Sequence, residues 1–165
     1  MTRNWPNLLP IFIFLVGVWA LLVAYYFELF HDLYPCVLCL YQRIPYGLCI
    51  CLGIFSFYKQ KSIEVCVLLA AICFFINMII ASYHFGVEKH WWTSILACES
   101  NLISVSSVDQ LKAMLLTKTK PACDSVEWTF FGISMAGYNA LISINLGLIC
   151  LLGYLKLRRT FCEKI

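Results

Sequence analysis

Charged residues are scarce in this sequence. They make up 13% of its 165 residues, whereas a soluble domain usually has about a quarter. Hydrophobic residues make up 62%, so there is too little polar surface to cover a soluble globule. Because a helix in lipid satisfies its own backbone hydrogen bonds, this apolar excess indicates membrane-spanning helices.

The sequence also lacks any block of basic residues and any glycine-rich phosphate-binding loop. These two absences argue against nucleic-acid and nucleotide binding. The net charge of +3 says little by itself. We therefore expect no nucleic-acid partner, and a lipid bilayer as the surroundings.

Four apolar runs are long enough to cross a bilayer, which takes about 20 helical residues. The expected helices cover residues 8–27, 36–58, 65–85 and 130–155. We predict an all-α fold, an integral membrane four-helix bundle that forms a single domain over residues 1–165. The first run exceeds the roughly 7–15 apolar residues of a signal peptide and no A-x-A-like cleavage site follows it, so we expect a retained helix.

Lysine and arginine are distributed unevenly between the two sides of this bundle. The side with both termini and the tight loop carries seven basic residues against two acidic ones, and the other side carries four against seven. The positive-inside rule then places both termini in the cytoplasm. The loops at 28–35 and 86–129 would face the outer, oxidising compartment.

The long outer loop contains a helical pattern of its own. Ser107 and Gln110 resemble a capping box. Apolar residues follow at helical spacing, namely Val108, Leu111, Met114 and Leu115. We predict a short amphipathic helix, which lies either on the membrane surface or against the bundle, since periodicity does not separate the two.

Of the ten cysteines, Cys162 lies in the basic C-terminal tail, and the other nine fall into two groups. Those within the apolar runs are expected to behave as small hydrophobes: Cys49, Cys51, Cys66, Cys73 and Cys150. Four others lie outside the spans or at their edges, on the side where disulfides persist: Cys36, Cys39, Cys98 and Cys123.

Cys36 and Cys39 form a C-x-x-C motif at the start of the second span. One helical turn separates them, and a helix N-terminus stabilises the thiolate that attacks disulfides. Two alternatives are a zinc site, which would need further ligands such as His31 and His84, and a structural disulfide. We favour a redox-active pair and expect no resident metal.

Arg43 follows Cys39 by four residues and therefore shares its helical face. A charge in an apolar helix is costly unless it lies near the interface or has a partner. Arg43 either extends to the lipid headgroups or donates to a carbonyl or anion beside the cysteines. A quinone would suit the second role, because its reduction places negative charge on an oxygen that a fixed cation stabilises.

Cys98 and Cys123 flank the predicted loop helix. A disulfide between them would close a loop of roughly 25 residues and contribute about 3 kcal/mol of stability. It could be a structural bridge, but exposed disulfides tend to be labile, so we favour an exchangeable pair. Four cysteines allow three pairings, and the residues alone do not choose among them.

Several segments together resemble the bacterial disulfide bond formation protein B (DsbB) family, including its DsbI relatives. One segment is Pro-Cys-Val-Leu-Cys-Leu-Tyr-Gln-Arg at 35–43. The others are Gly-Val-Glu-Lys-His-Trp-Trp at 86–92 with Ala-Cys at 97–98, and Ala-Cys-Asp at 122–124 followed by Trp-Thr-Phe-Phe-Gly at 128–132. The similarity runs in order along nearly the whole chain.

The resemblance implies a thiol oxidoreductase of the bacterial inner membrane. Cys98–Cys123 would reoxidise a periplasmic thioredoxin-fold oxidase, DsbA, and the electrons would pass to Cys36–Cys39 and then to ubiquinone or menaquinone. Arg43 falls on the family's quinone-contacting arginine, and Gln42 stands where glutamate is common. Some members use a histidine near the start of the long loop; we assign that role to neither His84 nor His90.

Two other classes of function compete with this one. A membrane reductase of the vitamin K epoxide reductase type also uses a quinone and two cysteine pairs, but its C-x-x-C lies in a late helix. A non-enzymatic scaffold or transporter subunit would keep Cys36 and Cys39 oxidised and inert, with quinone present or absent.

Overall fold

The structure is a computed structural model that describes residues 5–94, 123, 124, 126 and 128–162. Its long helices are α1 (Trp5–Phe30), α2 (Val37–Tyr58), α3 (Ile63–Glu88) and α5 (Met135–Cys162). All four are long and apolar enough to cross a membrane. The predicted all-α membrane bundle is therefore confirmed.

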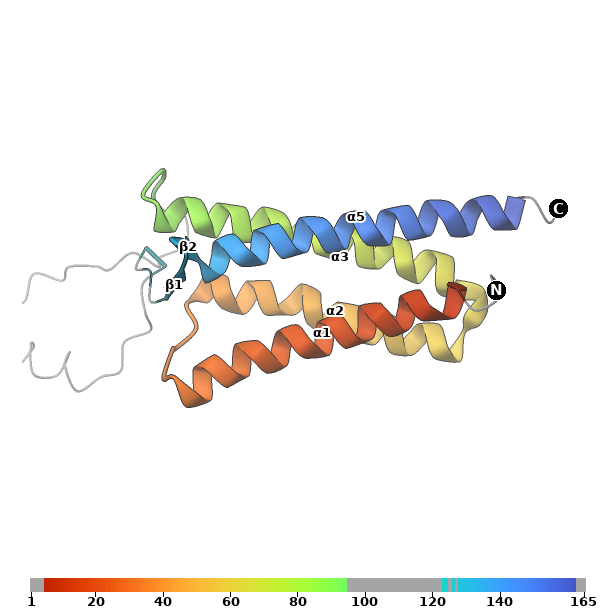
Figure 1. The fold of residues 1–165 in the computed structure, drawn as a ribbon, viewed down its shortest axis with the longest axis horizontal. Coiled ribbons are helices and arrows are strands. Elements are labelled where there is room, and N and C mark those ends of the chain that lie inside the picture. Colours follow the sequence, from red (N-terminus) through yellow and green to blue (C-terminus); the bar gives the residue numbers. More distant parts are fainter. Residues whose placement is uncertain (1–4, 95–122, 125, 127, 163–165) are drawn as a thin grey trace, which may run out of the picture.

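The four helices run side by side along the long axis of the molecule (Figure 1). α1 packs on α2, α2 on α3, and α3 on α5, which is the most extensive contact. A 3₁₀ turn, η1 (Gln60–Ser62), joins α2 to α3. The start of α1, the η1 turn and the end of α5 lie at one end of the bundle (Figure 1), and the connection from α1 to α2 lies at the other.

Two glycines allow α1 and α2 to approach closely. A Cβ atom on Gly17 would lie 2.9 Å from the carbonyl oxygen of Tyr46, and one on Gly53 would lie 2.7 Å from Cβ of Phe14. Real Cβ atoms essentially never make such short contacts, so a larger residue would force the helices apart. This packing fixes where α2, and with it the C-x-x-C motif, lies against α1.

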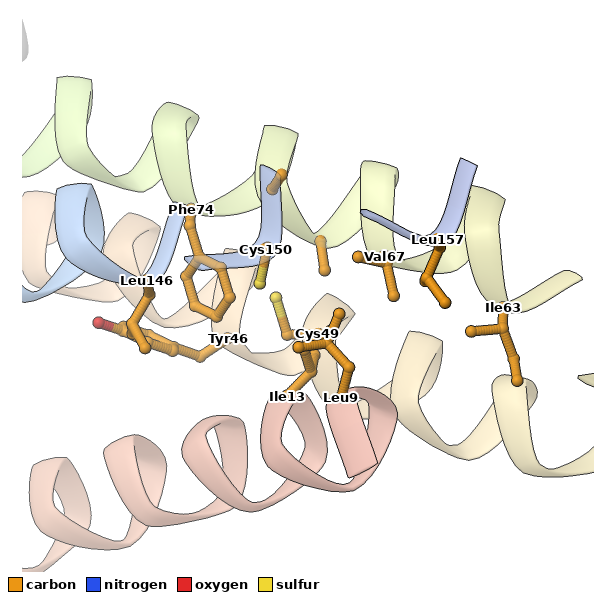
Figure 2. Close-up of a cluster of buried hydrophobic side chains, with 12 residues drawn as sticks. Leu9, Ile13, Tyr46, Cys49, Ile63, Val67, Phe74, Leu146, Cys150 and Leu157 are labelled. Atoms are coloured by element: carbon orange, nitrogen blue, oxygen red, sulfur yellow. The ribbon is translucent and has the colours of Figure 1, made fainter. Parts of the chain in front are cut away.

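The main apolar core fills the bundle from its middle towards the end that carries the termini. Figure 2 shows side chains from all four helices meeting there, with Phe74 and Val67 completely buried. Cys49 and Cys150 lie within this cluster and are also fully buried. They occupy the apolar positions expected of small hydrophobic residues.

Large apolar side chains cover the outside of the bundle. Trp19 is 70% exposed, Leu152 is 64% and Ile79 is 62%. A water-soluble protein rarely exposes so much contiguous apolar surface, whereas lipid solvates it well. The fold is that of a multi-pass membrane protein.

A short hairpin precedes α5. β1 (Thr129–Phe130) pairs antiparallel with β2 (Ile133–Ser134), and Gly132 adopts φ 77° in the turn between them. The fourth helix therefore begins at Met135 rather than at Phe130 as predicted. Phe130 and Ile133 hid the hairpin, because periodicity does not distinguish short apolar strand segments from a helix end.

Two other helices extend further than predicted towards the end of the bundle that carries the hairpin. α1 continues through Phe30 and α3 through Glu88. As a result Glu28 lies on a helix rather than in the first loop, and Glu88 lies one turn after His84 on α3. The loop helix predicted around Ser107 falls outside the described residues, as does Cys98.

Candidate functional site

The C-x-x-C pair opens α2 at the end of the bundle away from the termini. Cys36 is the N-cap residue, and Pro35 lies just before it. The Sγ atoms of Cys36 and Cys39 are 3.1 Å apart. The backbone N–H of Cys39 donates to Cys36 Sγ at 3.3 Å, so sulfur satisfies one of the unpaired N–H groups of the helix start.

Cys36 belongs to a small buried cluster that also contains Cys123. Its other members are Leu38 and Val87, and Cys39 packs against it. Cys36 is 5% exposed and Cys123 is 1% exposed. The structure thus brings together Cys36, Cys39 and Cys123 from distant parts of the chain, while Cys98 lies outside the part that it describes.

His84 of α3 lies directly beside the cysteine pair. Its Nε2 atom is 3.5 Å from Cys36 Sγ and 3.7 Å from Oε1 of Glu88. Its Nδ1 atom is 3.0 Å from Nε2 of Gln42. Because Gln42 accepts from Asn139 through its own oxygen, its amide nitrogen faces His84 and donates to Nδ1. The imidazole proton then resides on Nε2, towards the sulfur.

Glu88 connects the site to the hairpin before α5. Its side chain is 7% exposed, and its second oxygen accepts a short hydrogen bond from Ser134. The same Ser134 hydroxyl accepts from the backbone N–H of Gly137 at 3.3 Å, which caps the first turn of α5. The hairpin thus holds a buried carboxylate close to the histidine.

A chain of buried polar groups continues from Gln42 into the bundle. Asn139 accepts from the Tyr46 hydroxyl at 2.6 Å and from the Asn77 amide at 3.2 Å. Asn77 also donates to Ser143 at 2.8 Å. These bonds join α2, α3 and α5, so Asn77 and Asn139 link helices within the bundle.

Asn145 does not share that role. Its amide donates to the carbonyl of Leu141 on its own helix at 2.7 Å, and it is exposed. It faces away from the bundle, since it lies on a different side of α5 from Asn139 and Ser143. Its position within an apolar run did not reveal which side of α5 the Asn145 side chain occupies.

Arg43 pairs with Glu28 of α1 at 2.8 Å. Its guanidinium also lies over the ring of Tyr25, 4.9 Å from the centroid. The Arg43 side chain is 17% exposed and that of Glu28 is 27% exposed. This partner was absent from the sequence interpretation, which had placed Glu28 in the loop.

The Cys36 thiol, just before the membrane-spanning part of α2, is held in its protonated form. Its hydrogen bond to Cys39, followed by burial, raises the pKa of Cys36 to about 12, and the neighbouring His84 lowers it by less. The helix N-terminus was expected to favour a thiolate here. In this arrangement the sulfur of Cys39 and the loss of water outweigh that effect on Cys36.

Comparison with known families decides what kind of protein this is. The family model described as disulfide bond formation protein DsbB matches residues 6–153. The chain belongs to the DsbB family. It is therefore a membrane protein of disulfide bond formation, and the DsbB assignment makes it a thiol oxidoreductase at the level of the family.

Individual relatives share a little under a third of their residues with this chain. A disulfide bond formation protein B of Xylella fastidiosa (strain Temecula1) is 29% identical over 158 residues, covering 90% of this chain and 88% of the relative. The protein of strain 9a5c is 28% identical over the same length. An uncharacterized protein, RP370, of Rickettsia prowazekii is 28% identical over 145 residues, covering 86% and 81% of the two chains. No solved structure matches the chain.

Sequence reasoning missed the polar residues that surround the cysteines in this DsbB-family member. His84 was considered as a zinc ligand and as the family's quinone-site histidine but was assigned neither role, Gln42 was given little weight, and Glu88 was counted as a loop charge. One signal was present: His84 and Glu88 are four residues apart, so a helix that continued to Glu88 would place them on one face.

Proposed function

We propose that this protein reoxidises a periplasmic thioredoxin-fold dithiol oxidase of the DsbA type and passes the electrons to a membrane quinone, ubiquinone or menaquinone. The whole chain would act as one domain in the bacterial inner membrane, with both termini in the cytoplasm. Cys98 and Cys123 would form the outer cysteine pair, and Cys36 and Cys39 the inner pair.

In the first step the partner's dithiol is oxidised to a disulfide. The two electrons reduce the Cys98–Cys123 disulfide to two thiols, through a mixed disulfide between the proteins. The Cys123 sulfur then attacks Cys36 of the Cys36–Cys39 disulfide, and Cys39 leaves as a thiolate. Attack by Cys98 on the resulting Cys36–Cys123 bond restores the outer disulfide and leaves the inner pair reduced.

The gathering of Cys123 with both cysteines of the inner pair supports a transfer from the outer pair to the inner pair. Cys36 and Cys123 belong to one buried cluster, whereas Cys39 is only half-buried at its edge. A Cys123 sulfur in this cluster lies near enough to the inner pair for thiol–disulfide exchange with it. This is the single observation that carries the proposal beyond family membership.

The final step returns the Cys36–Cys39 dithiol to a disulfide with loss of two electrons and two protons, which a quinone accepts when bound. A strong oxidant of the DsbA type, at about −120 mV, needs an acceptor of higher potential. Arg43, one helical turn below Cys39, fits the quinone in chemistry: its guanidinium has five N–H donors and remains partly exposed beside Glu28. It would donate to a quinone oxygen as negative charge develops there.

His84 would assist the Cys36 sulfur during this step. Its Nε2 atom lies against Cys36 and its Nδ1 atom is held by Gln42. In this tautomer the Nε2–H group donates towards Cys36 and would stabilise the thiolate that forms there as the pair is oxidised. Oε1 of Glu88 lies 3.7 Å from the same Nε2 atom and helps to hold the ring in place.

The test uses purified protein, a reduced thioredoxin-fold partner and a soluble quinone analogue. Turnover of the partner's thiols should require quinone, and Cys39→Ser should abolish it. Cys51→Ser is the matched control, because Cys51 lies on the same helix with an exposed side chain and should retain full turnover. Unchanged quinone-dependent turnover in Cys39→Ser would overturn the proposal.

A further inference from the structure

Three metal-binding atoms converge at the start of α2. The Sγ atoms of Cys36 and Cys39 and a ring nitrogen of His84 all lie within 4.8 Å of one another. Cys36 and His84 are buried, and Cys39 is half-buried. Two thiolates and an imidazole are a common ligand set for zinc.

The spacing of these atoms is close to that of a tetrahedral site. Zinc bonds of about 2.0–2.3 Å place neighbouring ligand atoms roughly 3.3–3.8 Å apart. The separation of Cys36 Sγ and His84 Nε2 is 3.5 Å, and that of the two sulfurs is 3.1 Å. A small rotation of the half-buried Cys39 side chain would bring the separation of the two sulfurs into the same range.

Glu88 supplies a candidate for the fourth ligand. Its Oε1 atom lies 3.7 Å from Nε2 of His84, the length of a tetrahedral edge, although no Glu88 oxygen lies within 4.8 Å of all three other ligand atoms. Its other oxygen accepts from Ser134, so the carboxylate would have to turn towards the sulfurs to reach the metal. Carboxylate oxygen is an accepted zinc ligand, and two thiolates with one carboxylate leave the complex with a single negative charge.

We propose that the reduced Cys36–Cys39 pair binds one Zn²⁺ ion together with His84, with Glu88 or a water molecule as the fourth ligand. No electrons move on binding. The two thiols lose their protons to solvent as the sulfurs bind the metal, because a coordinating thiol is deprotonated outright. The disulfide form offers no thiolate and cannot bind, so the metal holds the pair in its reduced state.

Gln42 determines how readily His84 can serve as a ligand. Binding through Nε2 requires the imidazole proton on Nδ1, where it needs an acceptor. In the metal-free arrangement Gln42 presents its amide nitrogen there. A half-turn of this amide would present its oxygen instead, at the cost of its bond from Asn139. A glutamate at position 42 would accept the proton without this rearrangement.

The experiment measures zinc binding to the full-length protein in detergent, with neither partner nor quinone present. The protein is reduced, freed of reductant and titrated with Zn²⁺ against a chromophoric chelator. Cd²⁺ serves as a second probe, through its thiolate charge-transfer absorption. One equivalent should bind to the reduced protein and none to the oxidised protein.

Variants identify the ligands. Cys39→Ser should abolish binding, and His84→Ala should weaken it by at least about a hundredfold, more than the 10–100-fold typical of a supporting partner. His31→Ala is the matched control: His31 lies against the rings of Tyr26 and Phe27, away from the sulfurs, and binding should be unchanged. Gln42→Glu should tighten binding about tenfold or more, a gain that loss of fold cannot produce.

Equal affinity in the reduced and oxidised proteins, or wild-type affinity in His84→Ala, would overturn the zinc proposal. So would a Gln42→Glu protein that binds no more tightly than wild type. These readouts are separate from the proposed function, since quinone-dependent turnover in metal-free buffer could persist without any zinc binding. Conversely, a chain that binds zinc as described but never oxidises a partner would refute only the proposed function.

Discussion

The guanidinium of Arg43 donates a 2.8 Å hydrogen bond to the carboxylate of Glu28 and so joins α2 to the end of α1. Arg43 is the one charged residue of α2. A partly exposed ion pair between neighbouring helices offsets the cost of placing that cation in a membrane span. It also restricts the guanidinium to one side of α2, close to the C-x-x-C motif.

Replacement of Arg43 should affect the quinone more than the thiols. We expect Arg43→Ala to raise the quinone KM roughly tenfold, the effect of losing one charge-assisted hydrogen bond of about 1.5 kcal/mol, with little change in the partner KM. Glu28→Gln keeps an acceptor oxygen for Arg43 while removing the opposing charge, so the quinone KM should not rise. Steady-state kinetics with each substrate varied in turn provide the measurement. An equal loss in both KM values for Arg43→Ala would identify a purely structural arginine.

The protonated state of Cys36 gives a prediction about its reactivity. Its pKa is raised from the 9.0 of an ordinary thiol to about 12, first by the hydrogen bond to Cys39 and then by burial. Alkylation of Cys36 in the reduced protein should therefore accelerate about tenfold per pH unit from near neutrality to about pH 10, without a plateau, because only the thiolate reacts. Peptide mapping after timed iodoacetamide treatment separates Cys36 from the other cysteines.

Two variants test the causes of that shift. Cys39→Ala removes the largest cause, so Cys36 should react faster than in wild type at pH 8. His84→Ala removes a group that lowers the pKa, so Cys36 should react more slowly. A plateau in the wild-type alkylation rate near pH 9 would contradict the raised pKa of Cys36.

The raised pKa of Cys36 also affects stability. Because the folded protein binds this proton more tightly than the unfolded chain, the reduced protein should lose stability as pH rises above about 9.

The sequence predicted the membrane bundle because its signals are local. Long apolar runs and scarce charge define spans without any knowledge of packing, and the C-x-x-C motif marks its own position at a helix start. The face of each polar residue was harder to predict. Asn77, Asn139 and Asn145 look alike in apolar runs, yet the structure buries Asn77, half-buries Asn139 and exposes Asn145.

The surroundings of the cysteines depended on helix ends, which patterns locate poorly. A few further residues of helix place Glu28 opposite Arg43, and a similar extension places Glu88 beside His84. Charged residues near a helix end suggest a loop when only hydropathy is considered. The hydrogen bond from Asn139 to Gln42 joins residues far apart in the sequence, and no local pattern predicts it.

The buried amides should contribute to stability according to their partners. Asn77 is fully buried and bonds to both Asn139 and Ser143 on α5. Asn77→Leu should lower the free energy of unfolding by about 1 kcal/mol, as is typical of interhelical hydrogen bonds in membranes. Asn145→Leu is the matched control and should leave stability unchanged or raise it, since Asn145 is exposed and bonds within α5. Thermal unfolding in detergent gives both values, and equal destabilisation would refute the distinction between the two amides.

The two ends of the bundle differ in charge, and this difference predicts its orientation. Lys59 and Lys61 lie in the connection between α2 and α3, and Arg158 and Arg159 lie near the end of α5. At the opposite end the short connection after α1 carries Asp32 and no lysine or arginine. Basic residues are retained in the cytoplasm, so the cysteine pair should face the periplasm.

Labelling of intact cells with a membrane-impermeant maleimide tests this orientation. His31→Cys and Lys61→Cys place new thiols at exposed positions at opposite ends of the bundle. His31→Cys should gain label over wild type in intact cells, and Lys61→Cys should gain it only after the membrane is permeabilised. The reverse pattern would place Cys36 and Cys39 in the reducing cytoplasm, where a disulfide relay to a periplasmic partner is impossible. Because neither substitution alters a residue in contact with the cysteines, the result depends on topology and not on activity.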